Sequence, residues 1–402
     1  MKIAYCFCYL KWYNGTIIQK TSEDAINEKK RHFQPSLLSL LLRQSDLLPV
    51  IGHADLRSVK SMQSRHQRGC IFIKKGKNIM KNAKLKKILS AVIVLTMVFA
   101  LFAVTASADE KYSVGICQLV QHSALDAATL GFRDALTDAL GDSVEFDEQN
   151  ASGDISTCAV ICNGFAASDV DLILANATPA LQAAVAATDE IPILGTSITE
   201  YGVALDLDDF NGTVGGNISG TSDLAPLDQQ AQMIVDLFPE AKTVAILYCS
   251  AEANSVYQAD VVKAELEKNG LTVNICTFSD SNDVAAVTES ACADADVLYI
   301  PTDNTAASCA EAIGNVAEPA GVPIITGEEG PCAICGVATL TINYYDLGRT
   351  TGEMAAKILK GEADIAEMPV EYFPNPVKKF NPEMAELFNV AIPEDYEAIE
   401  LA

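Results

Sequence analysis

Polar side chains recur at one kind of position in this sequence, directly after short apolar runs that are typical of buried strands. One run ends at Ala175 and is followed by Asn176-Ala177-Thr178-Pro179, where the proline suits the first turn of a helix. Two other runs are followed by carboxylates, Glu252 and Asp303, in loops almost free of cations. Helix starts attract anions because their first backbone N–H groups lack partners within the helix. A helix start that faces a carboxylate could therefore hold a small molecule with both a carboxylate and an ammonium group.

These loops can lie close together only if the strands that precede them belong to the same sheet. The sequence predicts two such sheets. Short β-branched runs alternate with Ala-rich runs of helical length on both sides of a glycine-rich break at residues 201–226. Such alternation builds βαβ units, whose ligands bind outside the carboxyl ends of the parallel strands. We therefore predict an α/β fold of two doubly wound, Rossmann-like lobes that are joined by a hinge and enclose a cleft.

The expected strands define both lobes. We place lobe 1 at residues 109–224 with about 342–370, and lobe 2 at residues 225–341 with about 371–402. A helix over Tyr345–Lys360 is expected to end at Gly361 and to pack back on lobe 1. The strands are predicted at Tyr112–Leu119, Ser143–Gln149, Val170–Ala175, Ile191–Gly195, Thr243–Tyr248, Leu271–Phe278, Val297–Ile300 and Ile324–Thr326.

An export signal is predicted at residues 80–108. Met80 opens a lysine-rich segment, an apolar run follows from Ile88 to Ala103, and Ala106-Ser107-Ala108 is a small-x-small cleavage site. The apolar run is shorter than the ~20 residues that span a bilayer. We therefore expect a cleavable signal peptide and an extracytoplasmic protein that is periplasmic, secreted or at the cell surface.

Residues 1–79 differ in composition from the rest of the chain. Residues 1–108 hold 18 of the 28 basic and 5 of the 53 acidic residues, a net charge of +13 (18 − 5). A basic arm that binds nucleic acid is one interpretation. The alternative, which we favour, is a mis-annotated upstream extension of the reading frame without ordered structure.

The remaining 294 residues carry a net charge of −38, from 10 basic and 48 acidic residues. This length suits two lobes, and the charge argues against nucleic acid or an anionic membrane surface as partner. No Lys or Arg occurs from Asp134 through Ala241, so a phosphate clamp is not expected there. We predict a monomer that needs no cofactor or metal.

Nine cysteines fall in this acidic part, and most of them lie within apolar runs. A cysteine in such a run behaves as a small buried hydrophobe. Cys332 and Cys335 have the CxxC spacing of redox and zinc sites, but no second CxxC or nearby histidine completes a zinc site. Structural thiols or disulfides are the main interpretation, and a redox function is the alternative.

An α/β enzyme is the rival class of function. The acidic part contains one histidine, His122, and neither a G-x-S-x-G elbow nor a phosphate-binding G-x-x-x-x-G-K-[ST] loop. His122 as a general base is therefore less favoured than His122 as a loop or ligand contact. A sensor-type binding protein for another small polar solute is a second alternative.

Several stretches of the acidic part resemble the solute-binding proteins of ABC transporters, in the branch that includes tryptophan- and tyrosine-binding members. The resemblance spans most of residues 112–361, and its Pro-Thr-Asp-Asn block is the distinctive one. The matching stretches begin at Val114-Gly115-Ile116-Cys117, Asn176-Ala177-Thr178-Pro179, Gly220-Thr221-Ser222-Asp223, Ser255-Val256-Tyr257-Gln258, Tyr299-Ile300-Pro301-Thr302-Asp303-Asn304 and Tyr344-Tyr345-Asp346.

This resemblance implies a periplasmic-binding-protein type I fold that closes on a small molecule and delivers it to a membrane permease. It implies an aromatic amino acid as ligand, and the strand-end positions then predict its carboxylate at Thr178 and its ammonium at Asp303. The residues expected at the ligand are Gln121, His122, Asn150, Thr178, Pro179, Thr196, Ser222, Asn254, Asp303, Asn304, Glu328 and Tyr344.

Overall fold

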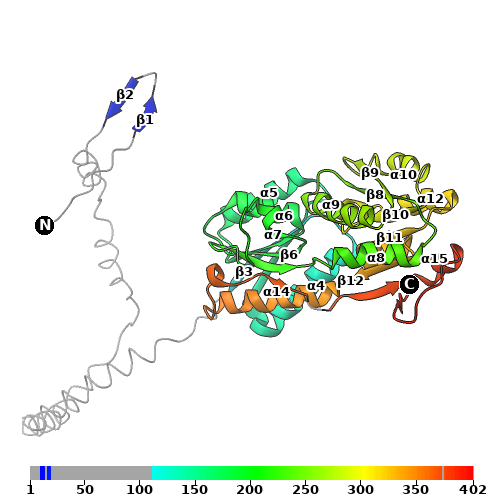
Figure 1. Ribbon diagram of the computed structural model, residues 1–402. Coiled ribbons are helices and arrows are strands. Elements are labelled where there is room, and N and C mark those ends of the chain that lie inside the picture. The colour runs from blue at the N-terminus through cyan, green and yellow to red at the C-terminus, as the bar shows by residue number, and fades with distance from the viewer. Residues whose placement is uncertain (1–9, 14–15, 20–110, 374, 402) are drawn as a thin grey trace, which may run out of the picture. The chain divides into compact units, whose positions relative to one another are not determined.

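Figure 1 shows the computed structural model, which describes residues 10–13, 16–19, 111–373 and 375–401. The chain divides into two compact units, residues 1–105 and 106–402. In the first unit, β1 (Leu10–Tyr13) pairs antiparallel with β2 (Thr16–Gln19). The predicted export signal lies outside the described residues, and no helix within those residues has the length and apolar character to cross a membrane.

The second unit starts with a six-stranded sheet of order β13-β7-β6-β5-β3-β4, in which every pair is parallel. Its central strands are buried on both faces, which explains their continuous apolar sequences. The strands are β3 (Tyr112–Gln118), β4 (Val144–Asn150), β5 (Leu172–Asn176), β6 (Ile193–Ile198), β7 (Ile218–Ser222) and β13 (Glu371–Tyr372). The helices of this lobe are α4 (Ser123–Leu140), α5 (Ile155–Ser168), α6 (Thr178–Ala187), α7 (Tyr201–Leu205) and α14 (Tyr344–Leu359), with 3-10 turns η1 (Gly141–Ser143) and η2 (Ile365–Glu367).

The second lobe is built on a seven-stranded sheet of order β15-β14-β12-β11-β10-β8-β9, in which β14 runs antiparallel to β12. Its strands are β8 (Thr243–Cys249), β9 (Thr272–Phe278), β10 (Val297–Ile300), β11 (Ile324–Thr326), β12 (Ala338–Thr341), β14 (Val377–Phe380) and β15 (Glu397–Ala398). Its helices are α8 (Leu227–Leu237), α9 (Ala253–Lys268), α10 (Val284–Cys292), α11 (Asn304–Ser308), α12 (Ala310–Ala320), α13 (Glu329–Ile334) and α15 (Pro382–Leu387). The predicted α/β fold with two parallel-sheet lobes is confirmed.

The chain passes between the two sheets three times: after β7, after β12, and between β13 and β14. After the second passage α14 packs along α4 of the first lobe, as Figure 1 shows. Glycines make this close crossing possible. A Cβ added at Gly131 would overlap the Tyr345 carbonyl, and one at Gly348 would overlap the Ala128 carbonyl.

Strand β7 was not expected from the sequence, because its residues are Ile-Ser-Gly-Thr-Ser and it follows a glycine-rich stretch. Gly220 has φ +147°, and a Cβ there would overlap the backbone of Gly195 on β6. Close pairing of β6 and β7 therefore selects glycine over the β-branched residues that signal a strand. Between β10 and β11 the chain forms two short helices, α11 and α12, which meet at Cys309.

Candidate functional site

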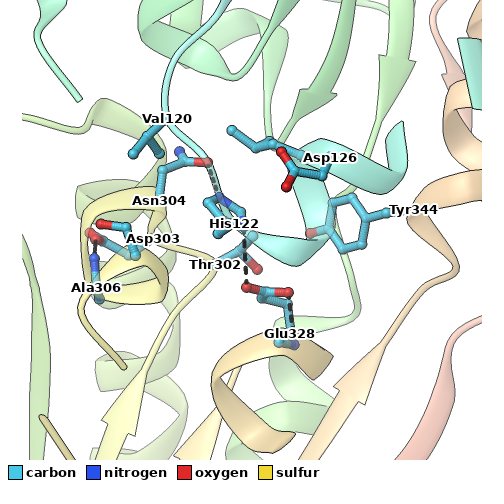
Figure 2. A network of polar contacts seen from close by, with 12 residues as sticks. Val120, His122, Asp126, Thr302, Asp303, Asn304, Ala306, Glu328 and Tyr344 are labelled. Atoms are coloured by element: carbon cyan, nitrogen blue, oxygen red, sulfur yellow. Dashed lines mark hydrogen bonds and ion pairs between the residues drawn. The ribbon is translucent and has the colours of Figure 1, made fainter. Parts of the chain in front are cut away.

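The carboxyl ends of the parallel strands in both lobes meet around His122, which follows β3 and precedes α4 (Figure 2). Its Nε2 lies 3.2 Å from Oδ1 of Asn304, at the start of α11 in the second lobe. Its Nδ1 lies 4.0 Å from Oε1 of Glu328, which follows β11. One first-lobe side chain thus contacts two loops of the second lobe, so the two lobes are closed on each other here.

Glu252, after β8, is a buried carboxylate that organises the second-lobe side of the site. Its Oε2 accepts from the side chain of Asn304 at 2.6 Å and from the backbone N–H of Asn304 at 3.1 Å. Its Oε1 accepts from the hydroxyl and the backbone N–H of Thr305 at 2.7 and 2.9 Å. With both oxygens occupied by donors, Glu252 holds the start of α11 in place.

Several buried polar atoms at the strand ends lack a hydrogen-bond partner. Leaving such an atom unpaired costs about 1–3 kcal/mol, so folded proteins contain few of them. Most of those in this protein follow strands of the two lobes, where a bound molecule would supply the missing partners. In the described part of the chain they include His122 Nδ1, Thr178 Oγ1, Ser197 Oγ, Asp223 Oδ1, Asn254 Oδ1 and Glu328 Oε1.

An acidic end of the site is formed by Asp223, Tyr344 and Glu328. The Tyr344 hydroxyl donates to Asp223 Oδ2 at 3.0 Å, and the backbone N–H of Gly330 donates to Glu328 Oε2 at 3.1 Å, so each carboxylate keeps one unpaired oxygen. Burial raises the pKa of Asp223 to about 6. Burial, with a smaller effect of the Asp223 charge, raises the pKa of Glu328 to about 7. A cationic group placed here would satisfy both carboxylates.

An anion-friendly end is formed by the start of α6. The N–H groups of Thr178 and Ala180 have no acceptor within the helix, and the Thr178 hydroxyl is buried without a partner. Ala177 and Ser197, at the ends of the paired strands β5 and β6, have φ of +93° and +56°. Such backbone strain in non-glycine residues often accompanies ligand sites.

Four of the predicted site residues have a different environment from the one we expected. Gln121 and Asn150 are exposed, and Asn150 accepts from the backbone N–H of Ser152 in a turn. The Thr196 hydroxyl accepts from the hydroxyls of Thr221 and Thr351 beneath α14. The Ser222 hydroxyl donates to the carbonyl of Thr199.

Asp303 requires a correction of role. Its Oδ1 accepts from the backbone N–H of Ala306 and its Oδ2 from that of Cys249, both at 2.7 Å. Figure 2 shows it turned toward Ala306, as the cap of α11. Both oxygens therefore serve the backbone, and the geometry assigns the cationic group to Asp223 and Glu328 instead.

Asp223 and Ser197 were missed from the sequence, although Asp223 lies in one of the stretches that carry the resemblance. The end of strand β7 is the signal that would have found Asp223, and that strand was itself hidden by its glycine and hydroxyl residues. Among the predicted residues, the structure brings His122, Thr178, Asn254, Asn304, Glu328 and Tyr344 to the buried ends of the strands.

Two cavities flank this network. A groove of about 400 Å³ between the lobes is lined by loops that include Val120, Pro179 and Glu252. A larger cavity of about 620 Å³ lies on the hinge side and is bordered by Glu328 and Tyr344. Small molecules therefore have space on both sides of the buried network.

The nine cysteines of the acidic part are all free thiols. Cys332 and Cys335 are buried, and burial raises the pKa of Cys335 to about 12. Redox-active thiols need a lowered pKa, so the structure favours packing over redox chemistry for this pair. Within the described residues no group of His, Cys, Asp and Glu side chains could hold a metal ion.

Residues 113–399 match the family model described as ABC transporter substrate binding protein. This chain belongs to that family. Members of this family are binding proteins that work outside the cytoplasm, so the enzyme alternative is set aside. The resemblance seen in the sequence, and the solute-binding function that it implied, are confirmed at the level of the family.

Individual relatives of this ABC transporter substrate-binding protein are similar over most of their own length. The tyrosine-binding protein of Clostridioides difficile strain R20291 is 37% identical over 272 residues, which cover 66% of this chain and 77% of that relative. The solved structure of an ABC domain from Streptococcus pneumonia, in complex with L-Trp, is 32% identical and has a TM-score of 0.69. The match covers 72% of this chain and 100% of the chain in that structure.

A third relative separates the closed arrangement from the open one. It is a substrate-binding protein with adhesive properties from Clostridium difficile, solved in its ligand-free, open form. It is 35% identical and covers 72% of this chain and 100% of that one, yet its TM-score is only 0.56. The more similar sequence thus has the less similar shape, in agreement with closed lobes in the present structure.

Proposed function

We propose that this protein captures an aromatic amino acid, tyrosine or tryptophan, and delivers it to the permease of an ABC importer. One observation carries the ligand class: two opposite kinds of unpaired buried group lie at the carboxyl ends of the strands, where the lobes meet. Asp223 and Glu328 suit an α-ammonium, and the start of α6 suits an α-carboxylate. The aromatic side chain is supported by the two relatives whose names specify tyrosine and L-Trp.

The binding cycle follows from the position of these groups on separate lobes. Thr178, Ser197 and Asp223 lie on or beside the first sheet, and Glu328 follows a strand of the second. An amino acid bound to the first lobe would gain its contact with Glu328 only on closure. Because the ligand then binds the closed form more tightly than the open one, it shifts the population toward closure.

The test is isothermal titration of the protein with each of the twenty amino acids. Tyrosine or tryptophan should bind selectively, and Asp223→Asn should weaken that binding about 10- to 100-fold, since hydrogen bonds to a charged group contribute about 1.5–3 kcal/mol. The control Asp138→Asn, at an exposed ion pair with Arg349, should bind normally. Absence of binding across the whole panel would contradict the proposal.

We also propose the export route and the lobe boundaries predicted above, with lobe 1 extended through β13 to Tyr372. A signal peptide cleaved after Ala108 would release the acidic, two-lobed part as a monomer that does not bind nucleic acid. N-terminal sequencing of the native protein tests this route, with Asp109 as the expected first residue. A native protein that begins before residue 80 would contradict both the cleavage site and the view that residues 1–79 are not translated.

A further inference from the structure

The Asn304 side chain determines which nitrogen of His122 carries a proton. The Asn304 amide donates from Nδ2 to Glu252 Oε2 at 2.6 Å, and an ionised carboxylate can only accept. The Asn304 Oδ1 is therefore the atom that faces His122 Nε2 at 3.2 Å, and it can only accept. His122 must accordingly donate from Nε2. In a neutral imidazole this leaves Nδ1 with a lone pair, aimed at the acidic end of the site (Figure 2).

We propose that His122 is a specificity-determining residue whose Nδ1 accepts the third N–H of a primary α-ammonium group, so that the site rejects N-alkylated amines. The inference rests on the proposed function and deepens it. Glu252 and Asn304 act as positioning residues, because they fix the imidazole tautomer without touching the ligand.

Three acceptors match the three N–H donors of a primary ammonium group. The atoms are His122 Nδ1, Asp223 Oδ1 and Glu328 Oε1, and all three are buried without a partner. The 4.0 Å between His122 Nδ1 and Glu328 Oε1 can be bridged by one nitrogen about 2.8 Å from each. A secondary amine has one donor fewer and would place an alkyl group against an unpaired buried acceptor, which is costly.

The charged groups around His122 are consistent with a neutral ring. Burial has the largest effect and lowers the pKa of His122. The hydrogen bond to Asn304 and the negative charges of Glu252 and Asp126 raise this pKa by smaller amounts. The Asp126 carboxylate accepts from the side chain of Gln118 at 2.7 Å, and Glu252 is occupied by Asn304 and Thr305. An imidazolium would present a donor at Nδ1 and would repel the ammonium group.

Nearby cations do not compete for the acceptors. Lys379 lies 2.7 Å from Glu329, the neighbour of Glu328, and forms an ion pair there. Tyr344 donates to the other oxygen of Asp223, and the Thr199 side chain lies near the same carboxylate, but Asp223 Oδ1 itself has no hydrogen-bond partner. The acidic end thus retains its acceptors for the ligand.

The first experiment compares the affinities for L-tyrosine and N-methyl-L-tyrosine, and for L-tryptophan and N-methyl-L-tryptophan, by isothermal titration of the full chain. The wild type should prefer the primary amine at least ten-fold. His122→Leu removes the acceptor and presents apolar carbon atoms to the N-methyl group, so the preference should fall to two-fold or less. Equal affinities of the wild type for the two amines would overturn the inference and leave the proposed function intact.

The second experiment observes the tautomer directly, by ¹⁵N NMR of histidine-labelled protein saturated with L-tyrosine. The signal missing from His122→Leu identifies the ring among the four histidines of the chain. We expect a protonated Nε2 and an unprotonated Nδ1 that accepts a hydrogen bond, and Asn304→Leu should lose this fixed pattern. A protonated Nδ1 would overturn the inference, whereas failure of the wild type to bind any amino acid would overturn the proposed function together with it.

Discussion

Four buried carboxylates lie near the cleft, and the donors around each one decide what it can do. Glu252 and Asp303 have both oxygens occupied by donors of their own lobe. Asp223 and Glu328 each keep one unpaired oxygen. Acidic residues that look equivalent in the sequence therefore divide into two that hold loops in place and two that can receive a ligand.

Asp303→Ala should affect stability more than ligand binding. Loss of the helix cap should lower the free energy of unfolding by about 1–2 kcal/mol, visible as a lower urea midpoint. Asp154→Ala, which removes the cap of α5, is the matched control and should behave similarly. Unchanged stability combined with a large loss of affinity for tyrosine would instead indicate that Asp303 binds the ammonium group of the ligand.

At the scale of elements, the crossing of α4 and α14 positions two site residues together. His122 immediately precedes α4, and Tyr344 opens α14. At Gly131 and Gly348 the two helices lie so close that the backbone of one is in contact with the backbone of the other. Any side chain at these positions would separate the helices and thereby move His122 away from the Tyr344–Asp223 pair.

Gly348→Ala should therefore destabilise the protein by about 1–3 kcal/mol, the range for overpacked sites, and should also weaken tyrosine binding. Gly164→Ala is a suitable control, because a Cβ there meets no atom within 4 Å. In a helix interior that substitution should stabilise by roughly 0.5–1 kcal/mol. Thermal unfolding and titration of both variants provide the comparison, and equal behaviour of the two would refute the role given to the crossing.

At the scale of the whole molecule, closure buries Asp223 and Glu328 whether or not a ligand is present. Burial raises the pKa of both groups in the closed form, to about 6 for Asp223 and about 7 for Glu328, from their ordinary values of 3.8 and 4.5. In an open form these carboxylates would be solvated and their pKa values would be nearer the ordinary ones. Between about pH 7 and pH 4 the closed form thus binds more protons than the open form, so acid favours closure.

The ligand-free protein should accordingly be more closed at pH 5 than at pH 8. The full pKa shifts correspond to roughly 3 kcal/mol per group, and about half of this or more is realised between pH 8 and pH 5, which is enough to move a two-state equilibrium across its midpoint. Small-angle X-ray scattering of residues 109–402 should show a smaller radius of gyration at pH 5. The double variant Asp223→Asn, Glu328→Gln should lose this dependence, and opening at low pH would contradict the argument.

The sequence by itself determined the fold class, because strand and helix periodicities are local and survive without knowledge of the tertiary contacts. It also indicated His122 and Thr178, since residues after buried strands must meet at the edge of a parallel sheet, and the resemblance to the family added Glu328. Tertiary structure alone decided the roles within that set. Whether a carboxylate such as Asp303 or Asp223 has a free oxygen depends on backbone donors distant in sequence, 54 residues away for the Asp303–Cys249 contact. Strand β7 was likewise hidden, because Gly220 is required by its close approach to β6 and not by any local preference.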